Sequence, residues 1–546
     1  MKKNFSKILF ASSLVVLASC DPEFDEPIED IVVTSGDADF SKYVALGNSL
    51  TSGFTDNALF ASGQVNSYPN MLAAQMAMAG GGNFTQPLMH DDIGGFLDLF
   101  QSTTAAGNPN FYGRLLLQMT PDGLKPTPQI PTKNLAETFV TGPFNNMGVP
   151  GAKSYHLIAN GYGNPAGISL GLANPYFARF ASSASTSVFA DAMAQQPTFF
   201  SLWIGNNDVL GYATSGGVGT NQMAANNTEA ATYGDKDISH PEVVKNSIEY
   251  MVSNLTGSGA KGVIANIPSI TDIPFFTTVP YAPLSPANEA FAAQIPTLNN
   301  LYGLLNQIFV ATGNGDRQIV FNTNAASAVV VKDETLADIG PIIKNVILSN
   351  PDLAQYHPLA DLLGGLYGQV RQANAQDLLV FTSQTVIGKK PGDGVDYIDN
   401  QTNGVLARLV TQYGLPAQVV GQFAVPGLTF PLEDQWVLTN TEKQEVIAAT
   451  NAYNTIIKQL AVNYDLAFVD AYQAMKDLSS QSGITYFGNT YTTTFVSGGA
   501  FSLDGVHLTG RGYAVVANYF VHAINQKYGS TLRTLNPNNF PGVVIP

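Results

Sequence analysis

A serine follows the first apolar run after the N-terminal segment, and an aspartate and a histidine stand three residues apart near the other end of the chain. Ser49 lies in Tyr43 to Phe54, YVALGNSLTSGF, where apolar residues lead into a turn flanked by glycines. A serine hydroxyl is a weak nucleophile until a general base takes its proton, and an imidazole oriented by a carboxylate is the usual base. Asp504 and His507 are such a pair by residue type. The three residues together fit nucleophilic acyl transfer.

The spacing of Asp504 and His507 predicts that both side chains lie on one side of a single turn. The carboxylate can then hold the Nδ1 proton of the imidazole and leave Nε2 facing the serine. Acyl transfer also needs donors for the oxyanion that develops, and losing one donor costs about 10²–10³ in rate. The available donors are the backbone N–H groups of Ser49 and Gly151 and the side-chain amide of Asn207.

The predicted strands bring these groups to one edge of a parallel sheet. The run Thr198 to Ile204 is almost wholly apolar, as expected of a central strand, and it leads directly into Gly205-Asn206-Asn207-Asp208. A predicted helix over Val243 to Leu255 followed by a strand over Gly262 to Ile267 implies a right-handed crossover and parallel strands. Open α/β sheets hold their ligands at the carboxyl ends of the strands. Asn207 is therefore expected to point into the same crevice as Ser49.

Other periodic segments complete the predicted framework. Residues 83–140 are rich in Gly, Pro, Phe and Thr and are expected to form irregular binding loops or lids. A capping-box pattern, Thr439-Asn-Thr-Glu442, predicts the start of a long helix. Further helices are predicted over Tyr68 to Ala79, Leu298 to Val310, Thr335 to Leu348 and Gly510 to Ile524, and further strands over Arg114 to Met119 and Leu466 to Val469.

Four motifs in this order resemble blocks I, II, III and V of the SGNH (GDSL) hydrolases: Gly47-Asn48-Ser49-Leu50, Gly151, Gly205-Asn206-Asn207-Asp208 and Asp504-Gly505-Val506-His507. The resemblance covers residues 40–150, 197–275 and 435–527. It implies a flavodoxin-like three-layer α/β/α fold with a central parallel sheet, and ester hydrolysis through an acyl-enzyme. It also implies Ser49 as nucleophile, His507 as base and Asp504 as its orienter, with Ser49, Gly151 and Asn207 forming the oxyanion hole.

Alternatives exist at three positions. Asn48 stands where the family's namesake tetrapeptide has aspartate, and Gly148 competes with Gly151, which the Val-Pro-Gly-Ala context favours. The segment Gly167-Ile168-Ser169-Leu170-Gly171 matches the G-x-S-x-G elbow of another hydrolase fold. That elbow needs a preceding strand, whereas Gly-Tyr-Gly-Asn-Pro precedes this one, so Ser169 is not expected to be the nucleophile. The remaining histidines are expected to be surface or structural residues and show no metal-ligand spacing, so we expect neither a metal nor a cofactor.

The N-terminus predicts export and lipidation. Three lysines precede the apolar run Ile8 to Ala18, which is too short to span a bilayer permanently and closes with Leu17-Ala18-Ser19-Cys20. This end resembles the lipobox of bacterial lipoproteins, in which cleavage leaves Cys20 as the acylated first residue. The alternative is an ordinary signal peptide with an incidental cysteine. The expected location is the bacterial cell envelope, above all the outer membrane, with attachment through Cys20.

Composition predicts a globular, acidic protein. The chain has 546 residues, of which 45% are hydrophobic and 12% charged, enough for a large core. Its formal charge of −16 becomes −19 when residues 1–19, with three lysines and no acids, are removed. This charge argues against nucleic acid as a partner and against electrostatic adhesion to anionic lipid. Asp21 to Asp39 holds eight acids, two prolines and no Lys or Arg, which predicts an extended solvated tether.

The expected organisation is a signal peptide over 1–19, an acidic tether over 20–39, a hydrolase core over 40–275 and 435–546, and an insertion over 276–434. The insertion is either a cap beside the active site or an independent packing domain. The expected function is that of a lipid-anchored serine esterase or lipase, whose substrate remains open between lipid or acyl esters and acetylated glycans. The competing hypothesis is a surface lipoprotein that binds a glycan or lipid on a degenerate hydrolase scaffold.

Overall fold

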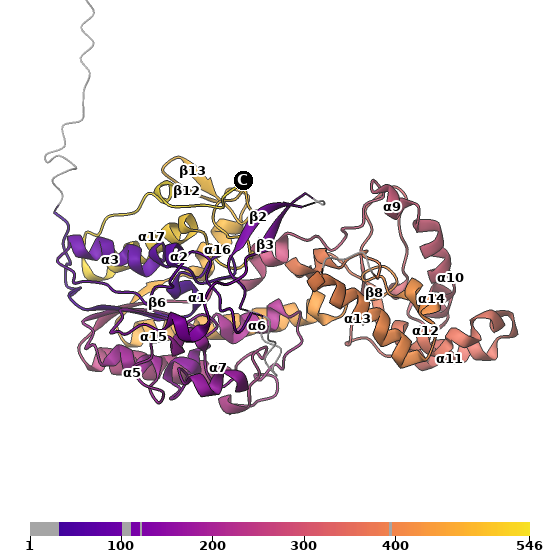
Figure 1. Ribbon diagram of the computed structural model, residues 1–546, viewed down its shortest axis with the longest axis horizontal. Helices are drawn as coiled ribbons and strands as arrows, with labels where there is room; N and C mark the ends of the chain where they lie inside the picture. The colour runs from indigo at the N-terminus through magenta and orange to yellow at the C-terminus, as the bar shows by residue number, and fades with distance from the viewer. Residues whose placement is uncertain (1–31, 101–110, 121–122, 392–395) are drawn as a thin grey trace, which may run out of the picture.

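An all-parallel sheet of five strands forms the centre of the larger of two bodies (Figure 1). The computed structural model describes residues 32–100, 111–120, 123–391 and 396–546; the predicted signal peptide and Cys20 lie outside these ranges. The sheet order is β11-β6-β5-β1-β4, so the direction of winding reverses between β1 and β5. The strands are β1 (Tyr43–Gly47), β4 (Asn146–Gly148), β5 (Phe199–Trp203), β6 (Lys261–Ala265) and β11 (Ala467–Val469).

The middle strands are apolar because helices cover both faces of the sheet. Every residue of β1 and β5 is buried, and the two strands pair from Tyr43 opposite Phe199 to Gly47 opposite Trp203. The predicted α/β class with a central parallel sheet is therefore confirmed. The edge strand β4 was not predicted, because its three residues, Asn-Met-Gly, contain no apolar run. It forms by pairing with β1.

Long helices lie on the two sides of the sheet, as Figure 1 shows. One side holds α3 (Tyr68–Met78), α16 (Ala471–Ser479) and α17 (Gly510–Tyr528), and the other holds α5 (Val188–Met193), α7 (Pro241–Gly257) and α15 (Asn440–Asn463). Across the first side the ring of Tyr68 stacks on Phe520 with centroids 4.6 Å apart. The predicted capping box is present, since the backbone N–H of Thr439 donates to Glu442 at 2.7 Å.

The strands and helices that the sequence predicted for this body are all present, with ends shifted by a few residues. The strand predicted at Arg114 to Met119 is β2 (Leu115–Thr120), which pairs with β3 (Gly123–Pro128) in a hairpin outside the main sheet. The helix α16 was not predicted. It follows directly from the end of β11, where the Asp470 side chain caps it by accepting from the N–H of Gln473 at 3.1 Å.

The smaller body, coloured pink to orange in Figure 1, packs around a hydrophobic core of its own. That core draws on residues 279–437 and is built on α10 (Ile295–Ala311), α11 (Gly340–Ser349) and α12 (Ala360–Tyr367). The ring of Tyr302 lies 5.5 Å from Tyr367, and its hydroxyl donates to the Leu428 carbonyl at 2.7 Å. A separate core of this kind is what an independent packing domain requires.

The helix α11 starts later than predicted, because acidic residues hold the preceding segment in turns. Asp333 accepts from the N–H of Thr335 at 3.1 Å, and Asp338 accepts from the N–H of Gly340 at 2.8 Å. Short-range side-chain bonds of this kind compete with the helix. The predicted start at Thr335 was therefore about one turn too early.

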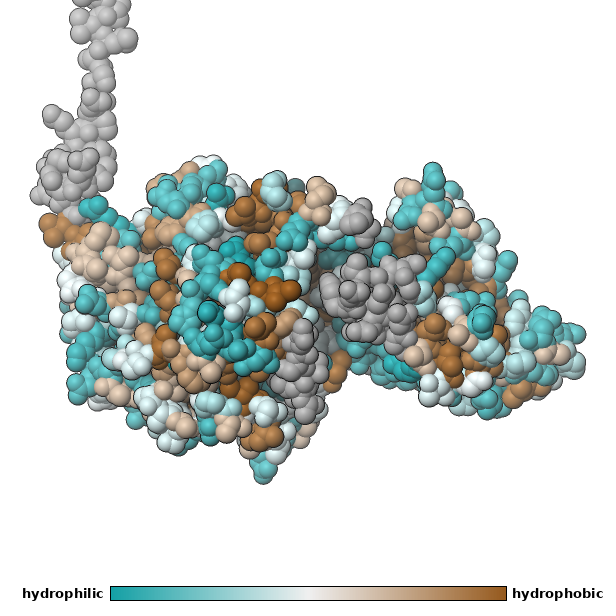
Figure 2. All heavy atoms as spheres, in the orientation of Figure 1, coloured by the Kyte–Doolittle hydropathy of each residue, from teal (hydrophilic) through white to brown (hydrophobic). Residues whose placement is uncertain are grey.

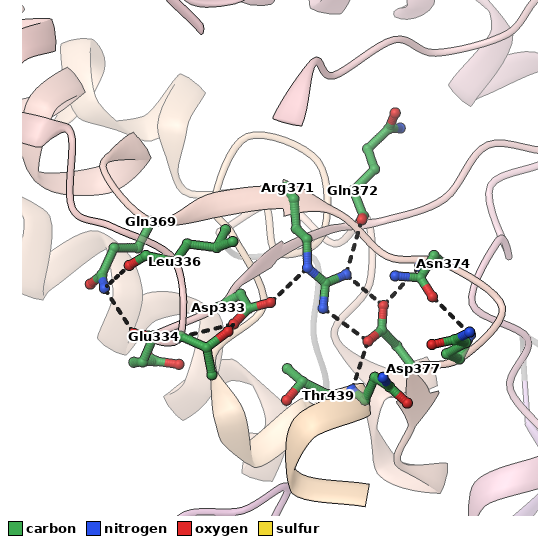
Figure 3. Close-up of polar contacts among 12 residues, drawn as sticks. Asp333, Glu334, Leu336, Gln369, Arg371, Gln372, Asn374, Asp377 and Thr439 are labelled. Atoms are coloured by element: carbon green, nitrogen blue, oxygen red, sulfur yellow. Dashed lines mark hydrogen bonds and ion pairs between the residues drawn. The ribbon is translucent and has the colours of Figure 1, made fainter. Parts of the chain in front are cut away.

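A buried ion-pair cluster joins the smaller body to the larger one (Figure 3). The guanidinium of Arg371 donates to Asp333 at 2.7 Å and to both oxygens of Asp377, at 2.6 and 2.9 Å. Asp377 is buried, and it also accepts from the backbone N–H of Asn440, the first residue of α15, at 3.1 Å. One carboxylate therefore bonds to both bodies.

The chain just before β1 is docked rather than extended into solvent. The N–H of Asp37 donates to the Tyr528 carbonyl at 2.8 Å, and the N–H of Thr34 donates to the Thr531 hydroxyl at 2.8 Å. Ala38 and Phe40 are buried in the main core. Within the described ranges, the expectation of a free tether up to residue 39 is therefore wrong for residues 34–39, because apolar residues interrupt its acids.

The described helices can be compared with the requirements for crossing a membrane. None of the described helices combines the length and the apolar character that crossing a bilayer requires. On the face drawn in Figure 2, hydrophilic and hydrophobic residues are interspersed over both bodies.

Candidate active site

Ser49, His507 and Asp504 form a hydrogen-bonded line at the carboxyl edge of the sheet. The Ser49 hydroxyl oxygen lies 2.9 Å from His507 Nε2, and His507 Nδ1 lies 2.8 Å from a carboxylate oxygen of Asp504. Ser49 opens the short helix α1 (Ser49–Ser52) directly after β1, whereas the other two precede α17. The structure thus brings together three residues, of which Ser49 and His507 are 458 positions apart.

The turn that carries Ser49 is fixed by the residue before it. The Asn48 side-chain oxygen accepts from the Leu50 N–H at 3.1 Å, which caps α1. Its amide nitrogen donates to the Asn206 side-chain oxygen at 3.2 Å, and both side chains are buried. Asn48 therefore links the turn after β1 to the turn after β5.

The Asp504 carboxylate is surrounded by donors. One oxygen accepts from the backbone N–H groups of Val506 and His507, each at 2.8 Å, and the other accepts from the N–H of Asn57 at 2.8 Å. Burial alone would raise the pKa of the carboxyl, but the charge of His507 and these hydrogen bonds hold the pKa of Asp504 well below its usual range. Asp504 is thus an ionised orienter for the imidazole.

Sequence reasoning missed the turn that supports Asp504 from the other side. Asp56 and Asn57 have φ values of 48° and 63°, in the left-handed region. The Asp56 side chain accepts from the Leu503 N–H at 3.1 Å, and Arg114 pairs with it at 3.3 Å. Asp and Asn tolerate this conformation better than other non-glycine residues. The Asp-Asn pair in Thr55 to Ala58 was the available signal.

Phe54 covers the imidazole. Its ring centroid lies 4.6 Å from that of His507, and its carbonyl accepts from the Tyr513 hydroxyl at 2.6 Å. The contact fixes the ring of His507 from the cleft side. Phe54 was not singled out in the sequence, where it reads as an apolar residue at the end of the turn.

Three donor hydrogens that are unpaired in the described structure belong to Ser49 and to residues that line one cleft with it. The N–H groups of Ser49 and Gly151 have no hydrogen-bond partner among the described residues. The Asn207 amide donates one hydrogen to the Ala152 carbonyl at 2.9 Å, which leaves its second hydrogen free. All three residues line the same cleft. These are the positions at which an oxyanion could be held.

Gly148, the competing glycine, has a packing role instead. Its N–H donates to the Asn146 side chain at 3.0 Å. A Cβ at this position would lie 2.4 Å from the backbone nitrogen of Ser52, whereas a Cβ at Gly151 would meet only the Asn174 side chain, at 3.8 Å. The close approach of β4 to α1 therefore requires glycine at 148, and the free N–H is at Gly151.

A buried carboxylate ties the loop that carries Gly151 to the helix that carries Asn207. Asp208, in α6 (Asn207–Thr214), accepts from the N–H and the hydroxyl of Ser154 at 2.8 and 2.9 Å. Burial raises the pKa of Asp208, and the charge of Lys153 opposes the rise. Asp208 thus sets the distance between two of the three donors.

The site opens into a cleft of about 590 Å³ that is lined by both apolar and polar residues. Such a volume lies within the usual range for ligand pockets. None of the described residues of 276–434 lines it, although neighbouring Gln435 does, and this favours an independent packing domain over a cap. The expected loop region 83–140 does contribute, through Phe111. Apolar lining residues include Phe54, Phe111, Ile168 and Tyr176, and polar ones include His156, Thr214, Asp235 and Lys236.

The remaining sequence candidates lie away from this arrangement. Ser169 is exposed in a 3₁₀ turn, Pro165–Leu170, with no strand before it. The Asp-x-x-His spacing also occurs at Asp237 and His240, but there the histidine Nδ1 accepts from the N–H of Glu242 at 3.2 Å. The Asp237 carboxylate instead accepts from its own loop. The spacing alone is therefore not sufficient for such a pair.

Comparisons with known proteins found no relative of this chain. Family models, curated proteins and solved structures all give no match to the chain. In the described ranges, no three His, Cys, Asp or Glu side chains gather as ligands for a metal ion would.

Proposed function

We propose that this protein is a serine ester hydrolase of the SGNH type. The observation that carries the proposal is the line from Ser49 through His507 to Asp504, with contacts of 2.9 and 2.8 Å. A serine hydroxyl, an imidazole and an ionised carboxylate in this order are the parts that nucleophilic acyl transfer uses. The unpaired N–H groups beside Ser49 supply the electrostatic part of the same chemistry.

The proposed reaction has two acyl-transfer steps. His507 Nε2 takes the proton of Ser49 as Oγ attacks the ester carbonyl carbon, and the carbonyl oxygen accepts hydrogen bonds from Ser49, Gly151 and Asn207. The tetrahedral intermediate collapses, the C–O bond of the ester breaks, and the alcohol leaves with the proton from His507. Water then repeats the sequence on the acyl-enzyme and releases the carboxylic acid.

The topology of the sheet supports the proposal. Counted along the chain, the five strands lie in the order 2-1-3-4-5, the flavodoxin-like order. Ligands in such sheets bind where the winding reverses, outside the carboxyl ends of the strands. Ser49 follows β1 and Asn207 follows the turn after β5, the two strands on either side of that point.

A fluorophosphonate probe tests the function directly. We expect the purified protein to form an adduct at Ser49 and to hydrolyse short-chain esters, and Ser49→Ala to lose both. Ser169→Ala is the matched control and should keep both. Retained hydrolysis in Ser49→Ala would refute the mechanism. Absence of any adduct in the wild type would favour the competing hypothesis, a surface lipoprotein that binds a glycan or lipid.

The proposed location is the bacterial cell envelope, with Cys20 acylated. The support is the lysine-led apolar run that ends in Leu-Ala-Ser-Cys. The first described residues lie on the larger body beside α17, so the anchor would join the body that carries the candidate site.

A further inference from the structure

His156 lines the cleft but takes no part in the proposed acyl transfer. Its Nδ1 accepts from the backbone N–H of Lys153 at 3.1 Å. The imidazole stacks on Tyr162 with centroids 4.7 Å apart and planes 18° from parallel, and the Tyr155 ring meets it edge-on at 4.4 Å. The orientation of the ring is therefore fixed by one hydrogen bond and two aromatic contacts.

The other nitrogen of this ring, Nε2, is unpaired in the described structure, and the residue lines the cleft. Nε2 has no hydrogen-bond partner among the described residues, and it is not one of the polar atoms sealed from solvent without a partner. Because Nδ1 accepts a hydrogen bond from an N–H, the proton of the neutral imidazole is on Nε2. His156 thus presents a preorganised N–H donor to whatever occupies the cleft.

The imidazole of His156 is uncharged around neutral pH. Burial, and then the charge of Lys153, lower the pKa of His156 to about 3. The ring is therefore neutral at neutral pH, where it is a donor rather than a base or a cation.

Charged groups of both signs lie with His156 in the lining of the cleft: Lys153, Asp235 and Lys236. The ammonium of Lys153 donates to the Gly234 and Asp237 carbonyls at 3.1 and 2.9 Å. Burial lowers the pKa of Lys153, and the charges of Asp208, Asp237 and Asp235 oppose that fall. Because the charges around it are mixed and the ring of His156 is itself uncharged, a neutral hydroxyl oxygen suits its N–H donor.

The position of His156 relative to the candidate oxyanion hole sets the size of the ligand. His156 and Gly151 are five residues apart in one loop, and five residues span at most roughly 18 Å. Ser49 and His156 line the same cleft, so an ester bound at Ser49 can place a polar alcohol portion at His156, and Phe54, Phe111 and Tyr176 in the same lining offer apolar surface to an acyl chain.

We propose that His156 Nε2–H binds a hydroxyl oxygen on the alcohol portion of the substrate, which makes esters of polyols or sugars the preferred class over esters of apolar alcohols. This inference rests on the proposed ester hydrolysis. His156 is a specificity-determining residue in this scheme and has no role in bond making or breaking.

Two esters with the same acyl group test the inference: glycerol monobutyrate and phenyl butyrate. His156→Asn keeps an oxygen near the Nδ1 position, for the Lys153 N–H, but removes the donor at Nε2. We expect it to lower the ratio of kcat/KM for the glycerol ester to that for the phenyl ester about five- to ten-fold, the effect of one lost hydrogen bond to a neutral group. His156→Gln, which can return a donor near Nε2, should restore part of the ratio.

His240→Asn is the matched control, since His240 also accepts a backbone N–H through Nδ1 but does not line the cleft. The ratio should be the same as in the wild type. An unchanged ratio in His156→Asn, with both esters slowed equally or not at all, would overturn the inference and leave the hydrolase proposal standing. Failure of the wild type to cleave either ester, without a Ser49 adduct, would instead refute the hydrolase proposal.

Discussion

The Asn48 amide donates to the side-chain oxygen of Asn206 at 3.2 Å, which joins the turn that carries the candidate nucleophile to the turn that carries Asn207. Asn206 Nδ2 is buried without a partner in the described structure. A carboxylate in place of Asn48 could accept from that nitrogen if the Asn206 amide were rotated, and could still cap the Leu50 N–H. The aspartate of the namesake tetrapeptide is therefore compatible with this site.

Substitutions at Asn48 should separate capping from charge. Asn48→Ala removes the cap and leaves buried polar groups unpaired, so we expect it to lower the free energy of unfolding by about 1–2 kcal/mol. Asn48→Asp keeps an acceptor at the same place and should cost less. Urea denaturation at neutral pH measures both, and an Asp variant that is less stable than the Ala variant would contradict this account.

Asp504→Asn should reduce kcat strongly while Ser49 stays in place. The carboxylate fixes the tautomer of His507 and accepts hydrogen bonds from three backbone N–H groups. In the Asn variant, the side-chain nitrogen that replaces one oxygen cannot accept such a bond. We expect a loss of about 10³–10⁴ in kcat, similar to other triads that lose their orienter. Ester turnover under saturation is the measurement; a loss below ten-fold would assign Asp504 a structural role only.

The same carboxylate gives a pH-dependent term in stability. The pKa of Asp504 is lower in the folded state than the ordinary value of about 3.9 in the unfolded chain, so ionised Asp504 stabilises the fold at pH above about 4. This contribution is lost as the pH falls towards the lower, folded-state pKa. The difference in unfolding free energy between wild type and Asp504→Asn should therefore be largest above pH 4 and shrink below it; a difference that is constant with pH would contradict this linkage.

Asn207→Ala should act on the transition state more than on substrate binding. If the free amide hydrogen stabilises the oxyanion, its removal lowers kcat about 10²–10³-fold with little change in KM. Asn70→Ala is the control. It removes a hydrogen bond from the exposed Asn70 side-chain amide to the Val65 carbonyl, and it should behave as the wild type. A change confined to KM would assign Asn207 to ground-state binding.

The buried cluster at the junction should matter for stability and not for turnover. Asp377→Ala leaves the Asn440 N–H unpaired and removes one of two carboxylates that bind Arg371. Because the partly exposed Arg371 keeps its bond to Asp333, we expect a loss of about 1–3 kcal/mol. The matched control is the exposed ion pair between Lys245 and Glu242 on α7. Its removal by Glu242→Ala should cost about 0–1 kcal/mol. Because Gln435 is the one described residue of segment 279–437 that lines the cleft, the folded Asp377→Ala protein should keep most of its kcat; a large fall would show that the smaller body affects the site.

Cys20→Ser tests the anchor. If Cys20 is acylated, the wild type should incorporate labelled palmitate and fractionate with membranes, and the variant should do neither while keeping esterase activity. Lys7→Gln is a matched change in the same segment that leaves the cysteine intact. Membrane association of the variant would favour an ordinary signal peptide or another means of attachment.

The sequence predicted the strands and helices that hold the site because apolar runs and caps are local signals. It placed Ser49, Asp504 and His507 together through their chemistry, and the structure has them within hydrogen-bond distance. It did not reveal β4, whose pairing depends on β1, or the Asp56-Asn57 turn, whose partner is 447 positions away. The pairing of β4 and the contact of Asp56 with Leu503 depend on residues distant in the chain; the only local signal was the Asp-Asn pair, which indicates a turn but not its partner.

The separation of Ser49 from His507 has a consequence for the order in which the protein is made. If the chain is exported from its N-terminus, as proposed, it presents the serine turn early and the imidazole only after the smaller body and α15 have emerged. Under the proposed mechanism, hydrolysis is then confined to chains extended at least as far as His507. The cell envelope would receive an esterase that stays inactive throughout most of its own translocation.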